Sequence, residues 1–158
     1  MDTRCMDTEA KTTISIASDH AGFVLKQVLM GHLQEQGYEV IDLGTDGTDS
    51  VDYPDFAHKL AENIKGRRSE KGVLVCGSGI GISIAANRHT EVRAALVHDA
   101  LGAKMCRQHN DANVIAFGGR MIGQDVALDC LDTFLRTEFE GGRHARRVDK
   151  ITPESTQI

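Results

Sequence analysis

Five short apolar segments that alternate with helix-like stretches constrain the fold of this chain more than any other feature. They occupy residues 13–17, 39–43, 72–76, 93–97 and 113–117. Strands that alternate with helices are typical of a parallel sheet covered by helices on both faces. The chain has 158 residues, which suits one domain with a single core. We therefore expect an α/β fold with one doubly wound, five-stranded parallel sheet.

The stretches between the strands show helical periodicity. Leu25, Leu29 and Leu33 share one helical face, and Gly37 suits the left-handed end of that helix. Pro54 suits the first turn of the next helix. Further helices are expected at 82–87, 101–108 and 124–138. The connections are too short for a second domain, so the domain should span 13–158. We expect the polar residues 1–12 to form a disordered leader.

Composition excludes several classes of protein. The net charge of -5 and the pI near 5.8 disfavour nucleic-acid binding, because such binding usually needs a basic face. No apolar run approaches the roughly eighteen residues of a membrane span, and the start lacks the apolar core of a secretory signal. The four cysteines form no C-x-x-C pair, so neither a zinc knuckle nor a disulfide framework is indicated. These features predict a cytoplasmic protein without membrane association.

Ligands of open doubly wound sheets bind at the carboxyl ends of the strands. The loop CGSGIG at 76–81 follows the third expected strand. Its glycines let backbone N–H groups approach an anion, and a cysteine beside a helix N-terminus is a candidate thiolate. Ile82 stands where a dinucleotide motif requires glycine and where a C-x5-R phosphatase loop requires arginine. The loop predicts an anion site beside a reactive Cys76, although a structural glycine turn with a buried cysteine is the alternative.

Three further groups could carry chemistry. His109 lies between a helix and a strand, where it could act as a general acid–base or be a surface residue. Asp19 and His20 follow the first strand, although a helix N-cap explains Asp19 equally well. Arg143 and Arg147 share one face if their segment is helical, and paired guanidiniums suit a phosphate dianion. No histidine or cysteine set has a metal-ligand spacing, so we expect no catalytic metal.

Six pieces of the sequence, in the same order, resemble the type B ribose-5-phosphate isomerases, which are grouped with the galactose-6-phosphate isomerase subunits. The pieces are SDHAGF (18–23), VDYPDFA (51–57), CGSGIGISIAAN (76–87), RQHNDANV (107–114), FGGR (117–120) and EGGRHARRV (140–148). The resemblance covers Ile14 to about Ile151. It implies a flavodoxin-like or Rossmann-like sheet of strand order 2-1-3-4-5 and a homodimer, in some members paired into a tetramer. It also implies conversion of ribose 5-phosphate to ribulose 5-phosphate without a cofactor.

The resemblance also implies roles for individual residues. Cys76 matches the catalytic base, and His109 matches the residue that opens the furanose ring. One branch of the family uses a glutamate at the position of Ile82 as its base. The apolar residue here therefore resembles the other branch, which uses the cysteine. The positions matching substrate or phosphate contacts are Asp19, His20, Gly77, Ser78, Gly79, Ile80, Gly81, Asn110, Arg120, Arg143 and Arg147.

Two alternatives remain open at this stage. One is an isomerase of allose 6-phosphate or galactose 6-phosphate. The galactose enzymes divide their catalytic residues between two different subunits, whereas Cys76 and His109 occur here in one chain, which favours ribose. The other alternative is a flavodoxin-like regulatory or nucleotide-binding module without activity. The missing dinucleotide motif and the full set of reactive residues disfavour it.

Overall fold

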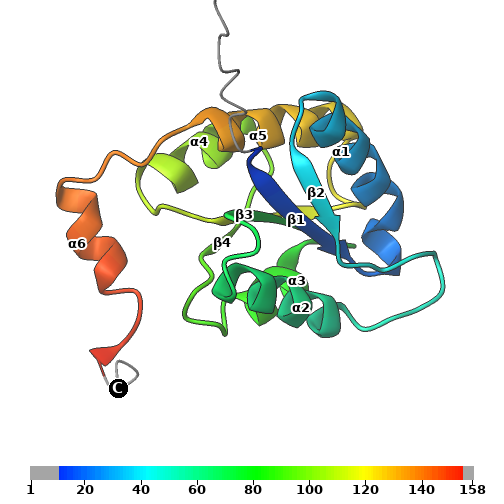
Figure 1. Ribbon diagram of the computed structural model, residues 1–158, viewed down its shortest axis with the longest axis horizontal. Helices are drawn as coiled ribbons and strands as arrows, with labels where there is room; N and C mark the ends of the chain where they lie inside the picture. The colour runs from blue at the N-terminus through cyan, green and yellow to red at the C-terminus, as the bar shows by residue number, and fades with distance from the viewer. Residues whose placement is uncertain (1–10, 155–158) are drawn as a thin grey trace, which may run out of the picture.

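A computed structural model describes residues 11–154 as helices packed on both faces of a central sheet (Figure 1). The strands are β1 (Thr13–Ser18), β2 (Glu39–Asp42), β3 (Lys71–Cys76), β4 (Ala94–Leu96) and β5 (Val114–Gly118). A short 3-10 helix, η1 (His20–Gly22), precedes α1 (Phe23–Glu35). The remaining helices are α2 (Tyr53–Lys65), α3 (Ile80–Ala86), α4 (Ala100–Gln108), α5 (Gln124–Arg136) and α6 (Arg143–Asp149). Most of the expected leader, residues 1–10, lies outside the described part of the chain.

The doubly wound parallel sheet is confirmed, but the order of its last two strands differs from expectation. The order is β2-β1-β3-β5-β4 rather than 2-1-3-4-5, so β5 lies beside β3 and β4 forms the edge. All five residues of β5 are buried, whereas the three residues of β4 are only partly buried. The longer apolar strand, β5, therefore takes the interior position beside β3, where both of its faces are covered.

Each face of the sheet has its own apolar core. Helices α1, α4 and α5 cover one face, and α2 and α3 cover the other. Right-handed crossovers explain this division, because connections toward opposite edges of a sheet place their helices on opposite faces. Side chains along β3 alternate between the cores: Val73 and Val75 face α1 and α5, while Leu74 and Cys76 face α2 and α3. Cys76 thus ends a buried strand on the side of α3.

Helix α6 differs from the other helices in its surroundings. It stands apart from the sheet at the left of Figure 1 and packs extensively against no other helix or strand of residues 11–154. Gly141 and Gly142, both with positive φ, separate it from α5. None of the helices in the described range is both long and apolar enough to cross a membrane.

The core should respond to truncation far more than the surface does. Leu131 of α5 is fully buried, whereas Gln34 of α1 is exposed. We expect Leu131→Ala to lower the free energy of unfolding by about 2–5 kcal/mol, because it removes buried methyl groups and leaves a cavity. The control Gln34→Ala should alter it by less than about 0.5 kcal/mol. Urea unfolding followed by circular dichroism measures both, and equal losses would contradict the assigned core.

Candidate active site

The residues predicted at the ends of β1, β3 and β5 lie together at the carboxyl edge of the sheet. They surround a hollow of about 690 Å³. Its lining includes Asp19, His20, Cys76, Gly77, Ser78, Ile80, Gly81 and Arg120. The hollow therefore lies at the edge that the rule predicts, since ligands bind at the carboxyl ends of parallel strands.

The glycine loop turns tightly around the sulfur of Cys76. Gly79 has a φ of 76°, and its N–H donates a hydrogen bond to Cys76 Sγ at 3.1 Å. A Cβ on Gly79 would lie 2.5 Å from Leu96 Cδ1 and 2.8 Å from the carbonyl carbon of Phe117. Both the left-handed conformation and the lack of space thus require glycine. Helix α3 begins at Ile80, directly after this loop, and the Ile80 N–H donates to Ser78 Oγ at 3.2 Å.

The described cysteines fall into two groups. Burial raises the pKa of Cys106 and of Cys130 to about 11, so both remain protonated near neutral pH. Cys76 instead lines the hollow at the carboxyl edge, and the Gly79 N–H donates a hydrogen bond to its sulfur. Cys76 is the cysteine placed for chemistry.

The two residues after β1 have defined partners. Asp19 is buried, and its Oδ1 accepts a hydrogen bond from the Gly22 N–H at 3.1 Å. Asp19 therefore caps η1 and lines the hollow as well. The Val51 N–H donates to His20 Nδ1 at 3.2 Å. In a neutral His20 ring the proton must then be on Nε2, which makes that nitrogen a donor.

Tyr53 is a lining residue that sequence reasoning did not select. Its ring packs on the glycine loop so closely that a Cβ on Gly81 would lie 2.5 Å from Tyr53 Cζ. The available signal was the piece VDYPDFA, which ends the loop between β2 and α2 at the carboxyl edge. Periodicity assigned that piece only to a helix start.

Four other predicted residues, His109, Asn110, Arg143 and Arg147, do not line this hollow. Helix α4 begins at the carboxyl edge after β4 and runs back, so His109 at its C-terminus lies toward the amino edge. The five residues of β5 span about 17 Å between these edges. Within one chain the structure therefore does not bring Cys76 and His109 together.

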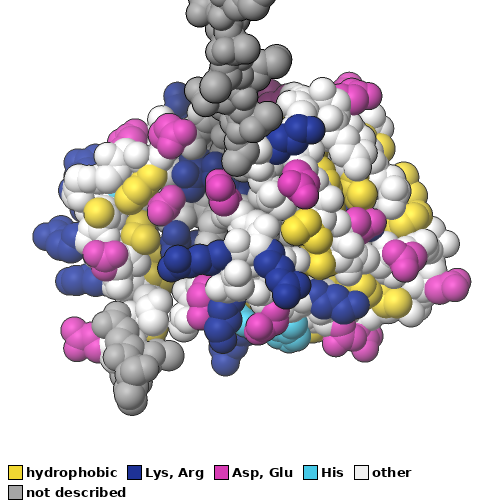
Figure 2. All heavy atoms as spheres, in the orientation of Figure 1, with side chains coloured by type: hydrophobic (Ala, Val, Ile, Leu, Met, Phe, Trp, Pro, Cys, Tyr) yellow, Lys and Arg dark blue, Asp and Glu magenta, His cyan; other side chains and the backbone are white. Residues whose placement is uncertain are grey.

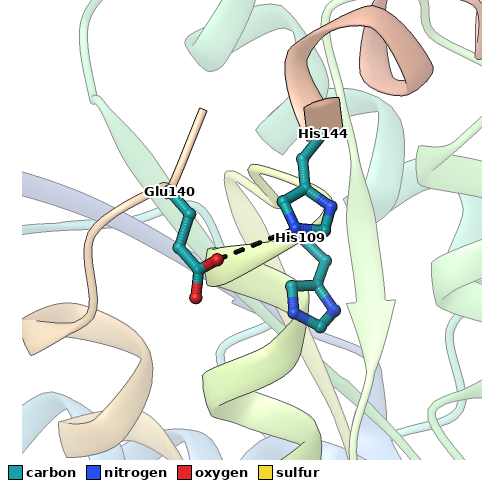
Figure 3. Close-up of side chains that lie close together, drawn as sticks. All are labelled: His109, Glu140 and His144. Carbon is teal, nitrogen blue, oxygen red and sulfur yellow. Dashed lines mark ion pairs between the residues drawn. The ribbon is translucent and has the colours of Figure 1, made fainter. Parts of the chain in front are cut away.

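The second group of residues has its own geometry, shown in Figure 3. The rings of His109 and His144 stack, with centroids 4.4 Å apart and planes 11° from parallel. Glu140 Oε2 lies 3.7 Å from His144 Nε2. Loss of solvation and the neighbouring His109 lower the pKa of His144, which favours its neutral ring. His144 was not among the predicted site residues, although the piece EGGRHARRV contains it.

Within residues 11–154, only His109, Glu140 and His144 form a set whose potential ligand atoms lie within 4.8 Å of one another. A metal ion binds an imidazole nitrogen through its lone pair, which lies in the plane of the ring. Two stacked, nearly parallel rings cannot both direct a nitrogen at one ion unless one of them turns. The arrangement is a stacked pair rather than a metal centre.

Comparison with known proteins assigns the family. Residues 14–151 match the model of a family described as Ribose/Galactose Isomerase. The chain is 45% identical over 139 residues to ribose-5-phosphate isomerase B of Escherichia coli, covering 88% of this chain and 93% of that protein. Many proteins could share a doubly wound sheet with a cysteine and a glycine loop at its carboxyl edge, but this sequence matches one particular family. The chain belongs to the ribose/galactose isomerase family.

Solved structures agree with this assignment. Ribose-5-phosphate isomerase B from Clostridium thermocellum aligns with a TM-score of 0.88 at 52% identity, covering 89% of this chain and 95% of that chain. A Mycoplasma genitalium ribose-5-phosphate isomerase B with bound ribulose-5-phosphate aligns with a TM-score of 0.84 at 42% identity, covering 89% and 93%. The resemblance seen in the six sequence pieces is confirmed.

The contrast among the cysteines generates a labelling prediction. In a Cys5→Ser background, which removes a thiol outside the described residues, we expect iodoacetamide at pH 8 to modify Cys76 alone. With a pKa of about 11 for each, Cys106 and Cys130 would be thiolate in only about one molecule in 10³. Peptide mapping by mass spectrometry locates the label. The control Cys5→Ser/Cys76→Ser should stay unmodified, and labelling of Cys106 or Cys130 at the rate of Cys76 would contradict the assignment.

Proposed function

We propose that this chain is a ribose-5-phosphate isomerase that interconverts D-ribose 5-phosphate and D-ribulose 5-phosphate without a metal or cofactor. The observation that carries this proposal is Cys76, held at the end of β3 with an N–H on its sulfur, in a chain whose relatives bear that name. We also place the enzyme in the cytoplasm. Cys76, Cys106 and Cys130 are free thiols, and the mechanism needs Cys76 to stay reduced.

The chemistry moves one proton between adjacent carbons of the open-chain sugar. The Cys76 thiolate removes the proton from C2, and the electrons of that C–H bond form the enediolate with negative charge on O1. The O2 proton then moves to O1, and the Cys76 thiol returns its proton to C1, which leaves a ketone at C2. N–H groups of the 77–81 loop would stabilise the charge, and losing one such donor typically costs about 3 kcal/mol of barrier.

Ring opening must come first, because ribose 5-phosphate closes into a furanose. The proton on O1 has to leave and the ring oxygen has to receive one. His109 suits this transfer because an imidazole gives and takes protons near neutral pH. Arg143 and Arg147 would bind the phosphate as paired guanidiniums, with Asn110 as a hydrogen-bond donor to the sugar. Asp19, His20 and Arg120 would contact the substrate from the hollow that contains Cys76.

We propose that the hollow around Cys76 and the group formed by His109 and α6 meet across a homodimer. Large exposed apolar side chains gather around the hollow at the carboxyl edge, which marks an interaction surface. Tyr53, Ile80, Ile84 and Met121 line the hollow, and Val24, Leu101 and Val126 lie in the first turns of α1, α4 and α5. Lys and Arg side chains gather over α6 (Figure 2). Arg143 and Arg147 of this helix are exposed. A two-fold axis would place His109 and α6 of each protomer against the hollow of its partner.

A shared site can be tested by mixing inactive variants. Cys76→Ala and His109→Ala should each be nearly inactive on ribose 5-phosphate. A mixed dimer contains one site with Cys76 from one protomer and His109 from the other, both intact. Random reassociation makes half of the dimers mixed, each with one of two sites intact, so about a quarter of wild-type activity should return.

Native mass spectrometry verifies that mixed dimers form after joint refolding. Mixing Cys76→Ala with Cys76→Ser is the control, and it should restore nothing. Absence of recovery in the presence of mixed dimers would show that each site uses residues of one chain.

Substrates that differ in ring closure test the activity and separate the two catalytic roles. In EDTA, wild-type kcat/KM should be highest for ribose 5-phosphate. His109→Ala should lose at least about 10²-fold on ribose 5-phosphate, because positioned proton transfer contributes on that order. The same variant should retain far more activity on erythrose 4-phosphate, which cannot close into a furanose carrying its phosphate. Cys76→Ala should be slow on both substrates.

His58→Ala, at an exposed histidine of α2, is the control and should leave kcat unchanged. A higher kcat/KM for allose 6-phosphate or galactose 6-phosphate would redirect the proposal to a six-carbon sugar. Equal losses of His109→Ala on both substrates would remove His109 from ring opening.

A further inference from the structure

His144 differs in burial from its neighbours on α6, the helix that carries the arginines proposed to bind phosphate. Arg143, Arg146 and Arg147 are exposed, whereas His144 is only 7% exposed. Helix α6 packs little against the other elements of the described chain, and His144 is the buried residue of this helix. The side chain it rests on is His109.

The stack is the contact that orients His109. Among residues 11–154, no side chain or backbone group makes a hydrogen bond to the His109 ring. The χ2 torsion of a histidine is broad in energy, so a half-buried ring without hydrogen bonds would turn freely. His144 restricts it, with the ring planes 11° from parallel (Figure 3). Glu140, at 3.7 Å from His144, is too far for a hydrogen bond and adds little to this restraint.

The backbone around the stack is fixed to the end of α4. The Glu140 N–H donates to the Gln108 carbonyl oxygen at 3.1 Å, and Arg107 Nε donates to the Thr137 carbonyl oxygen at 3.1 Å. The His144 N–H in turn donates to the Gly141 carbonyl oxygen at 3.1 Å. The end of α4 and the start of α6 thus form one connected unit.

The orientation of the ring matters for the chemistry proposed above. Each nitrogen of an imidazole donates or accepts a proton in the plane of the ring, so transfer between O1 and the ring oxygen needs that plane to contain both. Misplacement of a reacting group by about 1 Å can reduce a rate by as much as 10²-fold. A residue that sets the plane therefore acts on ring opening without touching the substrate.

We propose that His144 is a positioning residue for His109, holding its ring plane for ring opening and coupling it to Arg143 and Arg147 of the same helix. The inference rests on the proposed function. Because Arg143 and Arg147 flank His144 on α6, the phosphate contacts and the ring-opening group are held at a fixed separation. The contact between the two rings and the backbone hydrogen bonds that join the end of α4 to the start of α6 provide this coupling.

Two substitutions of similar bulk separate positioning from simple packing. His144→Leu fills the space but has no planar ring, whereas His144→Phe keeps a ring that can stack. We expect His144→Leu to lower kcat on ribose 5-phosphate on the order of 10²-fold, with KM and the rate on erythrose 4-phosphate changed much less. His144→Phe should recover most of that loss. Arg146→Ala, an exposed neighbour on α6, should leave all three values unchanged.

Nuclear magnetic resonance of ¹³C-histidine-labelled protein gives a readout that does not depend on activity. The His109 Hε1 resonance should be shifted by the ring current of residue 144 in the wild type and in His144→Phe, but not in His144→Leu. Equal activity losses of His144→Leu on both substrates, or an unchanged His109 resonance, would overturn the positioning role. Failure of the wild type to isomerise ribose 5-phosphate would instead defeat the proposed function, and the resonance would still report whether the rings stack.

Discussion

The pairing of β3 with β5 is the interaction on which the rest of this site depends. At the carboxyl ends of these strands, the Gly119 N–H donates to the Cys76 carbonyl oxygen at 2.8 Å, and the Arg120 N–H donates to the Gly77 carbonyl oxygen at 3.0 Å. The approach is so close that a Cβ on Gly118 would lie 2.6 Å from the Ser78 carbonyl oxygen. The end of β5 therefore fixes the shape of the loop that surrounds the Cys76 sulfur.

The position of β5 also determines which side chains reach the hollow. Arg120 and Met121 line it because they follow β5 directly. If β4 had occupied the position beside β3, His98 and Asp99 would follow the strand next to Cys76 instead. The exchange of β4 and β5 relative to the expected order is thus a decisive feature of the site. It places a guanidinium beside the glycine loop, where an anionic substrate would bind.

The reactive groups of this protein are divided between the two opposite edges of the sheet. A buried cysteine with one backbone donor lies at one edge, and a stacked histidine pair with exposed arginines lies toward the other. In the mechanism proposed above, the first group supplies the base that removes the carbon-bound proton, and the second supplies the histidine that opens the ring. A dimer that joins them would also shield both from water, which strengthens their electrostatic interactions.

The sequence by itself determined the elements and the chemistry they carry. Apolar runs and helical periodicity predicted each strand and five of the helices, because burial on both faces and one-sided packing leave distinct patterns. The loop after Cys76 and the spacing of Arg143 and Arg147 predicted an anion site, and α6 confirms that the two arginines share a helix. These features are local, so the order of residues along the chain is enough to reveal them.

Only the tertiary structure decided which elements became neighbours. The sequence could not place β5 beside β3, since the choice depends on which strand is better covered by helices on both faces. Nor could it show that Tyr53 packs on Gly81, that His144 stacks on His109, or that Cys76 and His109 lie toward opposite edges. Such contacts join residues far apart in the chain. Their formation depends on the packing of whole helices and strands, which no local pattern records.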